Sequence, residues 1–184
     1  GLRPIAVGEI LRRLVGKALC KNVQKTTRDY FWPRQVGVGS PLGSDCAVHT
    51  VRQGAQRHAT NPGKVILKLD FENAFNTIDR AHALAQLRRH FPGLSRWAHW
   101  CYASHSRLFF GDMDLASAAG VQQGDPLGPL LFACCVHPLV LELDRLFREG
   151  QFMDPESFNL FYLDDGVLCG DITTVAAGLR LVSE

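Results

Sequence analysis

The chain has 184 residues, and 46% of them are hydrophobic, which is enough for one globular domain with a sizeable core. Its longest apolar run, residues 130–136, is too short to cross a bilayer, and no apolar signal segment opens the chain. We therefore expect no membrane contact and an intracellular protein, nuclear or cytoplasmic and not secreted. Because no methionine begins the chain, we expect it to start inside a longer polypeptide.

The cysteines and the charge distribution give two further indications. The six cysteines form no CxxC pair, which argues against structural zinc and for buried thiols in a reducing compartment. The net charge of +2 is unevenly distributed: Lys and Arg outnumber acids eight to two in residues 1–36 and eight to four in residues 37–99, whereas acids lead twelve to four in residues 100–184. Two interpretations of this distribution are equally favoured: the protein binds a polyanion at its basic end and metal at its acidic end, or it has two solvated faces of opposite charge.

The first predicted element is an amphipathic helix that follows an extended start at Arg3-Pro4-Ile5 and ends near residue 21. Arg3 is a candidate phosphate ligand. One face of the helix is apolar and is expected to point inward: Ile10, Leu11, Leu14, Val15, Ala18 and Leu19.

A Gly- and Pro-rich loop is predicted next, over residues 33–45, with Ser44 or Asp45 capping a helix over residues 46–58. Residues 64–71 then predict a short apolar strand with Asp70 near its end. An aspartate at the end of a core strand is costly unless it is paired or bound to metal. Asp70 is therefore either a metal ligand or the cap of a following short segment, residues 72–76.

The middle of the chain predicts two helices, a strand pair and a Gly-rich loop. The helices cover residues 80–90 and 94–105, and the strand pair covers residues 107–110 and 113–119. The residues expected to point inward from these helices are Ala81, Leu84, Ala85, Leu87, Trp97, Trp100, Cys101 and Tyr102. The loop, residues 120–128, exposes backbone N–H groups that suit a polyanion or a flat base. It leads into a helix that begins at Pro129, kinks at Pro138 and stops at Gly150.

Two adjacent carboxylates, Asp164 and Asp165, lie in the last predicted hairpin. Its strands cover residues 158–162 and 167–169, with the turn placed at Asp165-Gly166 and a helix beginning at Ile172. The two charges repel, and burial between apolar strands would raise that cost. A divalent cation is the simplest compensation, and such a site needs one more carboxylate, for which Asp70 is the candidate.

Together, these segments resemble the motifs of reverse transcriptases. Residues 69–78, Leu-Asp-Phe-Glu-Asn-Ala-Phe-Asn-Thr-Ile, resemble motif A, and residues 161–165, Phe-Tyr-Leu-Asp-Asp, resemble the Tyr-x-Asp-Asp box of motif C. Residues 121–132, Val-Gln-Gln-Gly-Asp-Pro-Leu-Gly-Pro-Leu-Leu-Phe, resemble motif B in its non-LTR retrotransposon form. Arg3-Pro4-Ile5 resembles a fingers segment whose arginine contacts the incoming triphosphate. The motifs occur in the family's order across nearly the whole chain.

The resemblance implies an α+β fold: a polymerase palm, in which helices back an antiparallel sheet, with partial fingers and no thumb. Residues 1–63 would form partial fingers and the fingers–palm connection. Residues 64–184 would form the palm, ending before motif D, and the two parts together would be one reverse transcriptase domain fragment. The implied partners are an RNA template, a DNA or RNA primer and dNTPs, with further domains of the same polypeptide lying outside this chain.

The resemblance also implies roles for individual residues. Asp70, Asp164 and Asp165, with the backbone carbonyl of Phe71, would hold two Mg²⁺ ions, with Mn²⁺ as the alternative. Phe75 would be the steric gate that selects dNTPs over rNTPs. Other dNTP contacts would be Arg3, Phe71, Gln123 and Gly124, and the template and primer side would include Gly124, Pro126, Tyr162 and Leu163.

Asn76 departs from the family pattern, since many relatives have an aspartate there, and the parts that hold primer and template are not in this chain. We therefore expect weak or no polymerase activity from these 184 residues alone. Three alternatives stay open. An RNA-dependent RNA polymerase is disfavoured by Leu163 before the two aspartates and by Phe75; a non-catalytic RNA-binding remnant is disfavoured by the intact carboxylates; and an unrelated α/β domain would require three coincidences.

Overall fold

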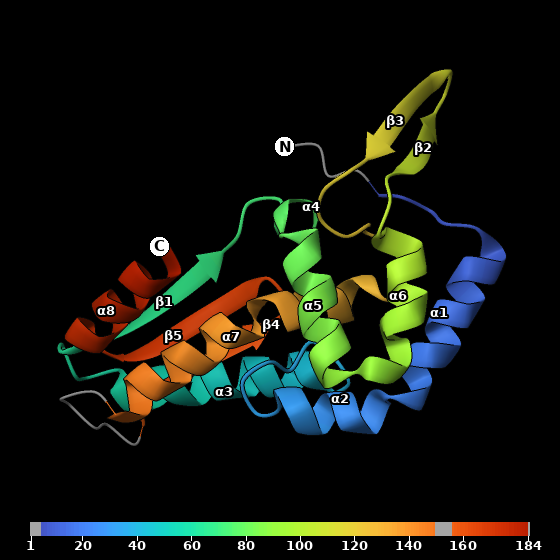
Figure 1. Cartoon of the computed structure of the whole chain (residues 1–184). Coiled ribbons are helices and arrows are strands. Elements are labelled where there is room, and N and C mark those ends of the chain that lie inside the picture. Colours follow the sequence, from blue (N-terminus) through green and yellow to red (C-terminus); the bar gives the residue numbers. More distant parts are fainter. Residues whose placement is uncertain (1–4, 150–155, 184) are drawn as a thin grey trace. The chain divides into compact units, whose positions relative to one another are not determined.

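The computed structural model describes residues 5–149 and 156–183, which form an α+β fold (Figure 1). The elements are, in order, α1 (Ile10–Asn22), α2 (Gln24–Phe31), α3 (Gly43–His58), β1 (Lys64–Asp70), α4 (Ala74–Thr77), α5 (Arg80–His90), α6 (Pro92–Tyr102), β2 (Ser106–Phe110), β3 (Met113–Ser117), α7 (Gly128–Glu149), β4 (Phe158–Tyr162), β5 (Asp165–Asp171) and α8 (Ile172–Ser183). None of the helices in the described ranges has the length and apolarity needed to cross a membrane.

The chain divides into two compact units, and each is assembled from two separate segments. Unit 1 contains residues 1–24 and 72–135, and unit 2 contains residues 25–71 and 136–184. The division falls inside α7, between Cys135 and Val136.

Unit 2 is built on a three-stranded antiparallel sheet in the order β1-β5-β4. In its register Leu69 lies opposite Gly166, and Asp165 lies opposite both Asp70 and Tyr162. The hairpin turn is therefore Leu163-Asp164, and the turn predicted at Asp165-Gly166 is wrong. Leu163 itself adopts the left-handed conformation, with φ of +56°. Gly166 serves packing instead, because a Cβ there would lie 2.5 Å from the ring of Phe161.

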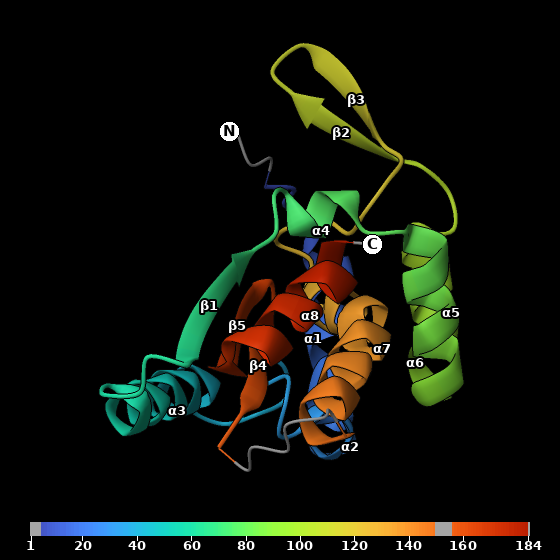
Figure 2. The same cartoon turned by 90° about the vertical axis from the view of Figure 1, so that its left-hand side faces the viewer.

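Alternation along the strands gives this sheet one face packed by α7 and α8 and another packed by α3. Leu69, Phe161 and Leu168 pack with Val140, Leu143 and Phe147 of α7 and Val175 of α8. α3 contacts all three strands, and at Gly54 an added Cβ would lie 2.9 Å from the ring of Phe158. The period of two residues in a strand thus produces a sheet that is covered on both sides (Figure 2).

Unit 1 contains α1, the helix pair α5–α6, the β2–β3 hairpin and the first turns of α7. Both views show the β2–β3 hairpin extending away from α5 and α6 (Figures 1 and 2). The predicted strand pair is present, with strands one residue longer and two residues shorter than expected over residues 107–110 and 113–119. The strands pair from Ser106 with Ser117 to Phe110 with Met113, and Phe109 and Phe110 are exposed.

The predicted orientation of α1 is wrong, although the helix itself is present. Ile10 and Leu11 are 81% and 72% exposed, while Gly16 on the opposite side is buried. The face with Arg12, Gly16 and Cys20 contacts the loop before α7: a Cβ on Gly16 would lie 3.4 Å from Pro126. Hydrophobic periodicity predicts an amphipathic helix. Here the ion pair between Arg12 and Asp125, and the close approach of Gly16 to Pro126, decide which face of α1 packs.

Several boundaries and inward positions also differ from the predictions. α3 starts at Gly43, and its N-cap position is Leu42, so the predicted cap by Ser44 or Asp45 is wrong. Gly43 leaves room for the backbone of Val36, because a Cβ there would lie 2.0 Å from the carbonyl oxygen of Val36. In α5, Leu87 is buried as predicted, but Ala81 and Ala85 are exposed and Ala83 is buried instead. In α6, Trp100 was expected to point inward and is 68% exposed.

In α7, Pro138 lies inside the helix. The predicted stop at Gly150 lies outside the described residues.

We predict that Leu168→Ala lowers the free energy of unfolding by about 2–5 kcal/mol, because Leu168 is fully buried in the core of unit 2. The matched control is Leu141→Ala on α7, whose side chain is 48% exposed and which we expect to cost about 1 kcal/mol or less. Urea unfolding followed by circular dichroism measures both. Equal losses for the two variants would contradict this core assignment.

Candidate active site

The register of the unit 2 sheet places two aspartates opposite each other. Asp70 is the last residue of β1, and its partner Asp165 is the first residue of β5. Directly opposed residues share one face, with Cβ atoms typically about 4.5–5.5 Å apart. Tyr162 lies opposite Asp165 on the other side, so the three residues form a row across β1, β5 and β4. Asp164 lies in the adjoining turn.

The sequence suggested that these carboxylates are buried between apolar strands, but the structure shows that they are not. Asp70 and Asp165 are exposed, and Asp164 is half-buried, because the strands end here and the sheet is open to solvent. Lys68, two residues before Asp70, places its Nζ 3.2 Å from Oδ1 of Asp165. This exposed ion pair offsets part of the repulsion between the aspartates, and exposed pairs of this kind contribute only about 0–1 kcal/mol. Lys68 is therefore easily displaced.

The alternative role of Asp70 as a helix cap is not what the structure shows. The short helix α4 begins at Ala74, and its N-cap position is Asn73, three residues beyond Asp70. Phe71 directly follows β1, and its side chain packs against the core of unit 2. Only its backbone is therefore suited to contact a ligand beside Asp70.

The chemistry of these donors fits a hard divalent cation. Mg²⁺ keeps several water ligands and is usually bound through one or two carboxylates together with substrate phosphates. Asp70 and Asp165 supply such oxygens at an open edge, with Asp164 next in the chain. A complete cluster of three Asp, Glu, His or Cys ligands is not assembled anywhere within residues 5–149 and 156–183. These carboxylates therefore suit a Mg²⁺ ion whose other ligands are water and substrate oxygens, rather than an ion bound by protein ligands alone.

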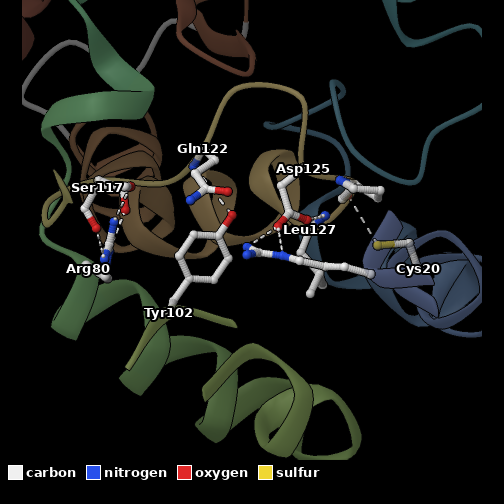
Figure 3. A network of polar contacts seen from close by, with 10 residues as sticks. Cys20, Arg80, Tyr102, Ser117, Gln122, Asp125 and Leu127 are labelled. Atoms are coloured by element: carbon white, nitrogen blue, oxygen red, sulfur yellow. Dashed lines mark hydrogen bonds and ion pairs between the residues drawn. The ribbon is translucent and has the colours of Figure 1, made fainter. Parts of the chain in front are cut away.

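The loop before α7 is held in unit 1 by a buried ion pair (Figure 3). Asp125 accepts hydrogen bonds from Nη2 and Nε of Arg12, at 2.7 and 3.2 Å, and from the backbone N of Leu127 at 2.9 Å. The Asp125 side chain is only 4% exposed. Burial lowers the pKa of Arg12, but the hydrogen bond with Asp125 and the charge of its carboxylate, with smaller contributions from Cys101 and Tyr102, together outweigh this, so the pKa is raised. The ion pair thus fixes the start of α7.

Tyr102 joins this network from α6. Its hydroxyl oxygen accepts a hydrogen bond from the backbone N of Gln122 at 3.4 Å, and the guanidinium of Arg12 lies 5.2 Å from its ring centroid. Burial and the nearby Asp125 carboxylate raise the pKa of Tyr102, so the phenol remains neutral at physiological pH. Arginine and tyrosine thus support the loop at Gln122 and Asp125.

A second arginine holds the other end of the same loop. The Arg80 guanidinium donates to the carbonyl oxygen of Ser117 at 3.0 Å (Figure 3). It also donates to the carbonyl oxygens of Ala119 and Gly120, at 2.9 and 2.7 Å. Gly120 has φ of +59°, and a Cβ there would lie 2.4 Å from the carbonyl oxygen of Phe75. These contacts tie the loop closely to the segment that carries Phe75.

Phe75 is fixed both through its backbone and through its ring. Its carbonyl oxygen accepts a hydrogen bond from Val121 N at 2.7 Å. Its half-buried ring stacks on Phe132, with centroids 4.7 Å apart and an interplanar angle of 16°. The stacking limits the positions that the Phe75 ring can adopt.

Gln123 and Gly124 lie beside the extended residues Ile5 and Ala6. The backbone N of Ala6 donates to the carbonyl oxygen of Gln123 at 2.9 Å, and Ile5 forms an isolated parallel bridge with Gln123. Gly124 is exposed, has φ of +103°, and has no room for a Cβ, which would lie 2.8 Å from the carbonyl oxygen of Ala6. Arg3 lies outside the described residues.

The site residues expected from the sequence thus fall into two groups. Unit 2 contains Asp70, Phe71, Tyr162, Leu163, Asp164 and Asp165, and unit 1 contains Phe75, Gln123, Gly124 and Pro126. Sequence reasoning missed Gln35, Arg12, Arg80 and Tyr102, which hold the backbone around these groups. One signal for the packed face of α1 was available in the sequence. Arg12 and the small residues Gly16 and Cys20 are spaced by four residues, so they share one face of the helix.

The chain resembles known proteins in family, in sequence and in structure. Residues 1–180 match the family described as reverse transcriptase (RNA-dependent DNA polymerase). A curated relative, the retrovirus-related Pol polyprotein from the type-1 retrotransposable element R2 of Nasonia vitripennis, is 31% identical in an alignment of 133 residues that covers 64% of this chain and 13% of that protein.

Solved telomerase structures share the fold at low sequence identity. Apo telomerase from Candida tropicalis, truncated from its C-terminal domain, matches with a TM-score of 0.61 and 14% identity over 91% of this chain and 36% of that chain. Telomerase from Candida albicans, in complex with a fragment of telomeric RNA, matches with a TM-score of 0.58 and 14% identity over 96% of this chain and 33% of that chain. The chain thus spans about a third or less of these relatives, and its match across residues 1–180 shows that it belongs to the reverse transcriptase family.

Proposed function

We propose that this chain is the palm and part of the fingers of an RNA-directed DNA polymerase of the non-LTR retrotransposon type. It would add dNTPs to a primer 3′-OH, on an RNA or DNA template, within a larger polypeptide. The observation that carries this proposal is the direct pairing of Asp70 with Asp165, with Asp164 in the adjoining turn. Membership of the family and similarity to the R2 polyprotein support the choice of reaction and of element type.

The three aspartates, with the backbone carbonyl of Phe71, are the residues we propose to hold two Mg²⁺ ions. Mg²⁺ held by these residues would supply Lewis-acid chemistry, which would lower the pKa of an attacking hydroxyl and neutralise charge on a triphosphate and a leaving pyrophosphate. Lys68 pairs with Asp165 at 3.2 Å and would give way there to a bound cation. Exposure of Asp70 and Asp165 leaves their oxygens open to a bound nucleotide.

The unit 1 residues would contact the nucleotide and the template. We propose Phe75 as the steric gate, because its ring is stacked on Phe132 and would clash with a ribose 2′-OH. Gln123 and Gly124 would line the nucleotide and template side, and Arg3 would bind phosphate. Pro126, Tyr162 and Leu163 would lie toward primer and template. Residues 1–63 would provide partial fingers and residues 64–184 the palm; alone, these residues are expected to extend primers weakly or not at all.

We predict that Asp70→Asn, Asp164→Asn or Asp165→Asn lowers primer extension by the full-length protein on the order of 100-fold or more, since each removes a charge that stabilises the transition state. The matched control is Asp171→Asn on β5, whose carboxylate pairs with Lys64 of β1 at 3.1 Å much as Asp165 pairs with Lys68. We expect the control to stay within about threefold of wild type. Wild-type extension by Asp164→Asn would contradict the proposed role of the aspartates, whereas a wild-type protein that extends no primer would favour a non-catalytic, RNA-binding remnant.

We predict that Phe75→Ala lowers the preference for dNTP over rNTP by about 10- to 200-fold, because a smaller side chain no longer excludes the 2′-OH. The measurement is the ratio of kcat/KM values, in which any loss of folded protein cancels. Phe109→Ala, at a phenylalanine of β2 that is 73% exposed, should leave the ratio unchanged. A wild-type protein that uses rNTPs as well as dNTPs would favour an RNA-dependent RNA polymerase instead.

A further inference from the structure

The turn that carries Asp164 has a conformation that its own sequence does not favour. Two-residue hairpin turns usually contain glycine or asparagine where φ is positive, because a Cβ there is crowded. Here Leu163 occupies that position with φ of +56°. A non-glycine residue in this region costs on the order of 1–3 kcal/mol and persists only where the surroundings enforce it. In this structure a side chain from a distant segment enforces it.

The side-chain amide of Gln35 bonds to both sides of Leu163. Its Oε1 accepts a hydrogen bond from Leu163 N at 2.8 Å, and its Nε2 donates to the Leu163 carbonyl oxygen at 3.2 Å. These two groups belong to the peptide planes that flank the Cα atom of Leu163, so one amide constrains both backbone dihedrals. The second plane also contains the backbone N of Asp164, and its direction is therefore set by Gln35.

Gln35 is itself firmly placed within unit 2. It is 1% exposed, and its segment pairs with β4: Phe161 N donates to Arg34 O at 2.7 Å, and Val36 N donates to Phe161 O at 2.8 Å. Gly37 N donates a third hydrogen bond to Gln35 Oε1, at 3.0 Å. A Cβ on Gly37 would lie 2.7 Å from Leu163 N, so only glycine leaves room for this arrangement.

We propose that Gln35 is a positioning residue for nucleotidyl transfer, which directs Asp164 by fixing the backbone of Leu163, and that Gly37 provides the space this requires. The proposal rests on the proposed function for its kinetic consequence. An amide suits the task because it combines a donor and an acceptor without adding charge beside the aspartates. Methionine has a similar length but can form neither bond, and an ionised glutamate would lose the donor and add a negative charge.

The kinetic test is single-turnover incorporation of one dNTP by the full-length protein. We expect Gln35→Met and Gly37→Ala to lower the maximal rate by about 10- to 100-fold, because small displacements of a catalytic group have effects of this size. The apparent Kd for the dNTP should change by less than about threefold. The matched control is Asn159→Leu on β4, a fully buried amide whose Nδ2 donates to Val140 O at 3.0 Å and does not contact the turn.

The control separates positioning from stability. Both Gln35→Met and Asn159→Leu should destabilise the fold, but after correction for the folded fraction only Gln35→Met should slow the reaction. Gln35→Glu gives a second readout, because a protonated carboxyl restores the donor to Leu163 O and an ionised one does not. Its rate relative to wild type should therefore fall as the pH rises and the carboxyl ionises. Equal slowing by Gln35→Met and Asn159→Leu would overturn the proposal.

A readout that needs no activity keeps this inference distinct from the proposed function. Hydrogen exchange of the Leu163 amide should accelerate at least tenfold in Gln35→Met, because its acceptor is Gln35 Oε1. The Phe161 amide, which donates to Arg34 O, should keep its protection. Unchanged exchange at Leu163 would overturn the role of Gln35. An inactive wild-type protein with this exchange pattern would overturn the proposed function but leave the turn contact confirmed.

Discussion

The antiparallel register between β1 and β5 is the constraint on which the rest of unit 2 depends. With Leu69 opposite Gly166, the next pair is Asp70 and Asp165, and both carboxylates lie on one face at the open end of the sheet. The same register directs Leu168 to the core with α7 and α8. A slip of one residue would send Leu168 to the opposite face and separate the aspartates. Core packing thus fixes the geometry of the candidate site, although the aspartates themselves are exposed.

Local patterns in the sequence predicted most helices and strands, including β1, β4 and the β2–β3 pair. They failed where a distant contact decides. The turn was placed at Asp165-Gly166 because Asp-Gly is a strong hairpin signal, but that glycine gives room to the Phe161 ring, and Leu163 turns the chain instead. For α1 the apolar face was expected to pack, but the ion pair of Arg12 with Asp125 selects the opposite face.

The same distinction applies to the site. Asp70, Asp164 and Asp165 were identified because carboxylates at strand ends are chemically conspicuous and because their order matches a known family. Gln35 gave no such signal: it lies in a Gly- and Pro-rich loop, 128 residues before the backbone that it binds. Arg80 is likewise 40 residues from Gly120. Side chains that hold a distant backbone follow no local period, so they emerge only from three-dimensional structure.

The discontinuous construction of unit 2 has a consequence for synthesis on the ribosome. β1 ends at residue 70, whereas its partner β5 starts at residue 165. Nearly a hundred further residues must therefore be synthesised before β1 can pair with β5. During that interval its apolar side chains and unpaired backbone groups are open to other chains. Long-range pairing of this kind also slows folding. A nascent chain of this design is therefore an obvious client for chaperones, and a halt in translation before residue 165 leaves β1 without its partner.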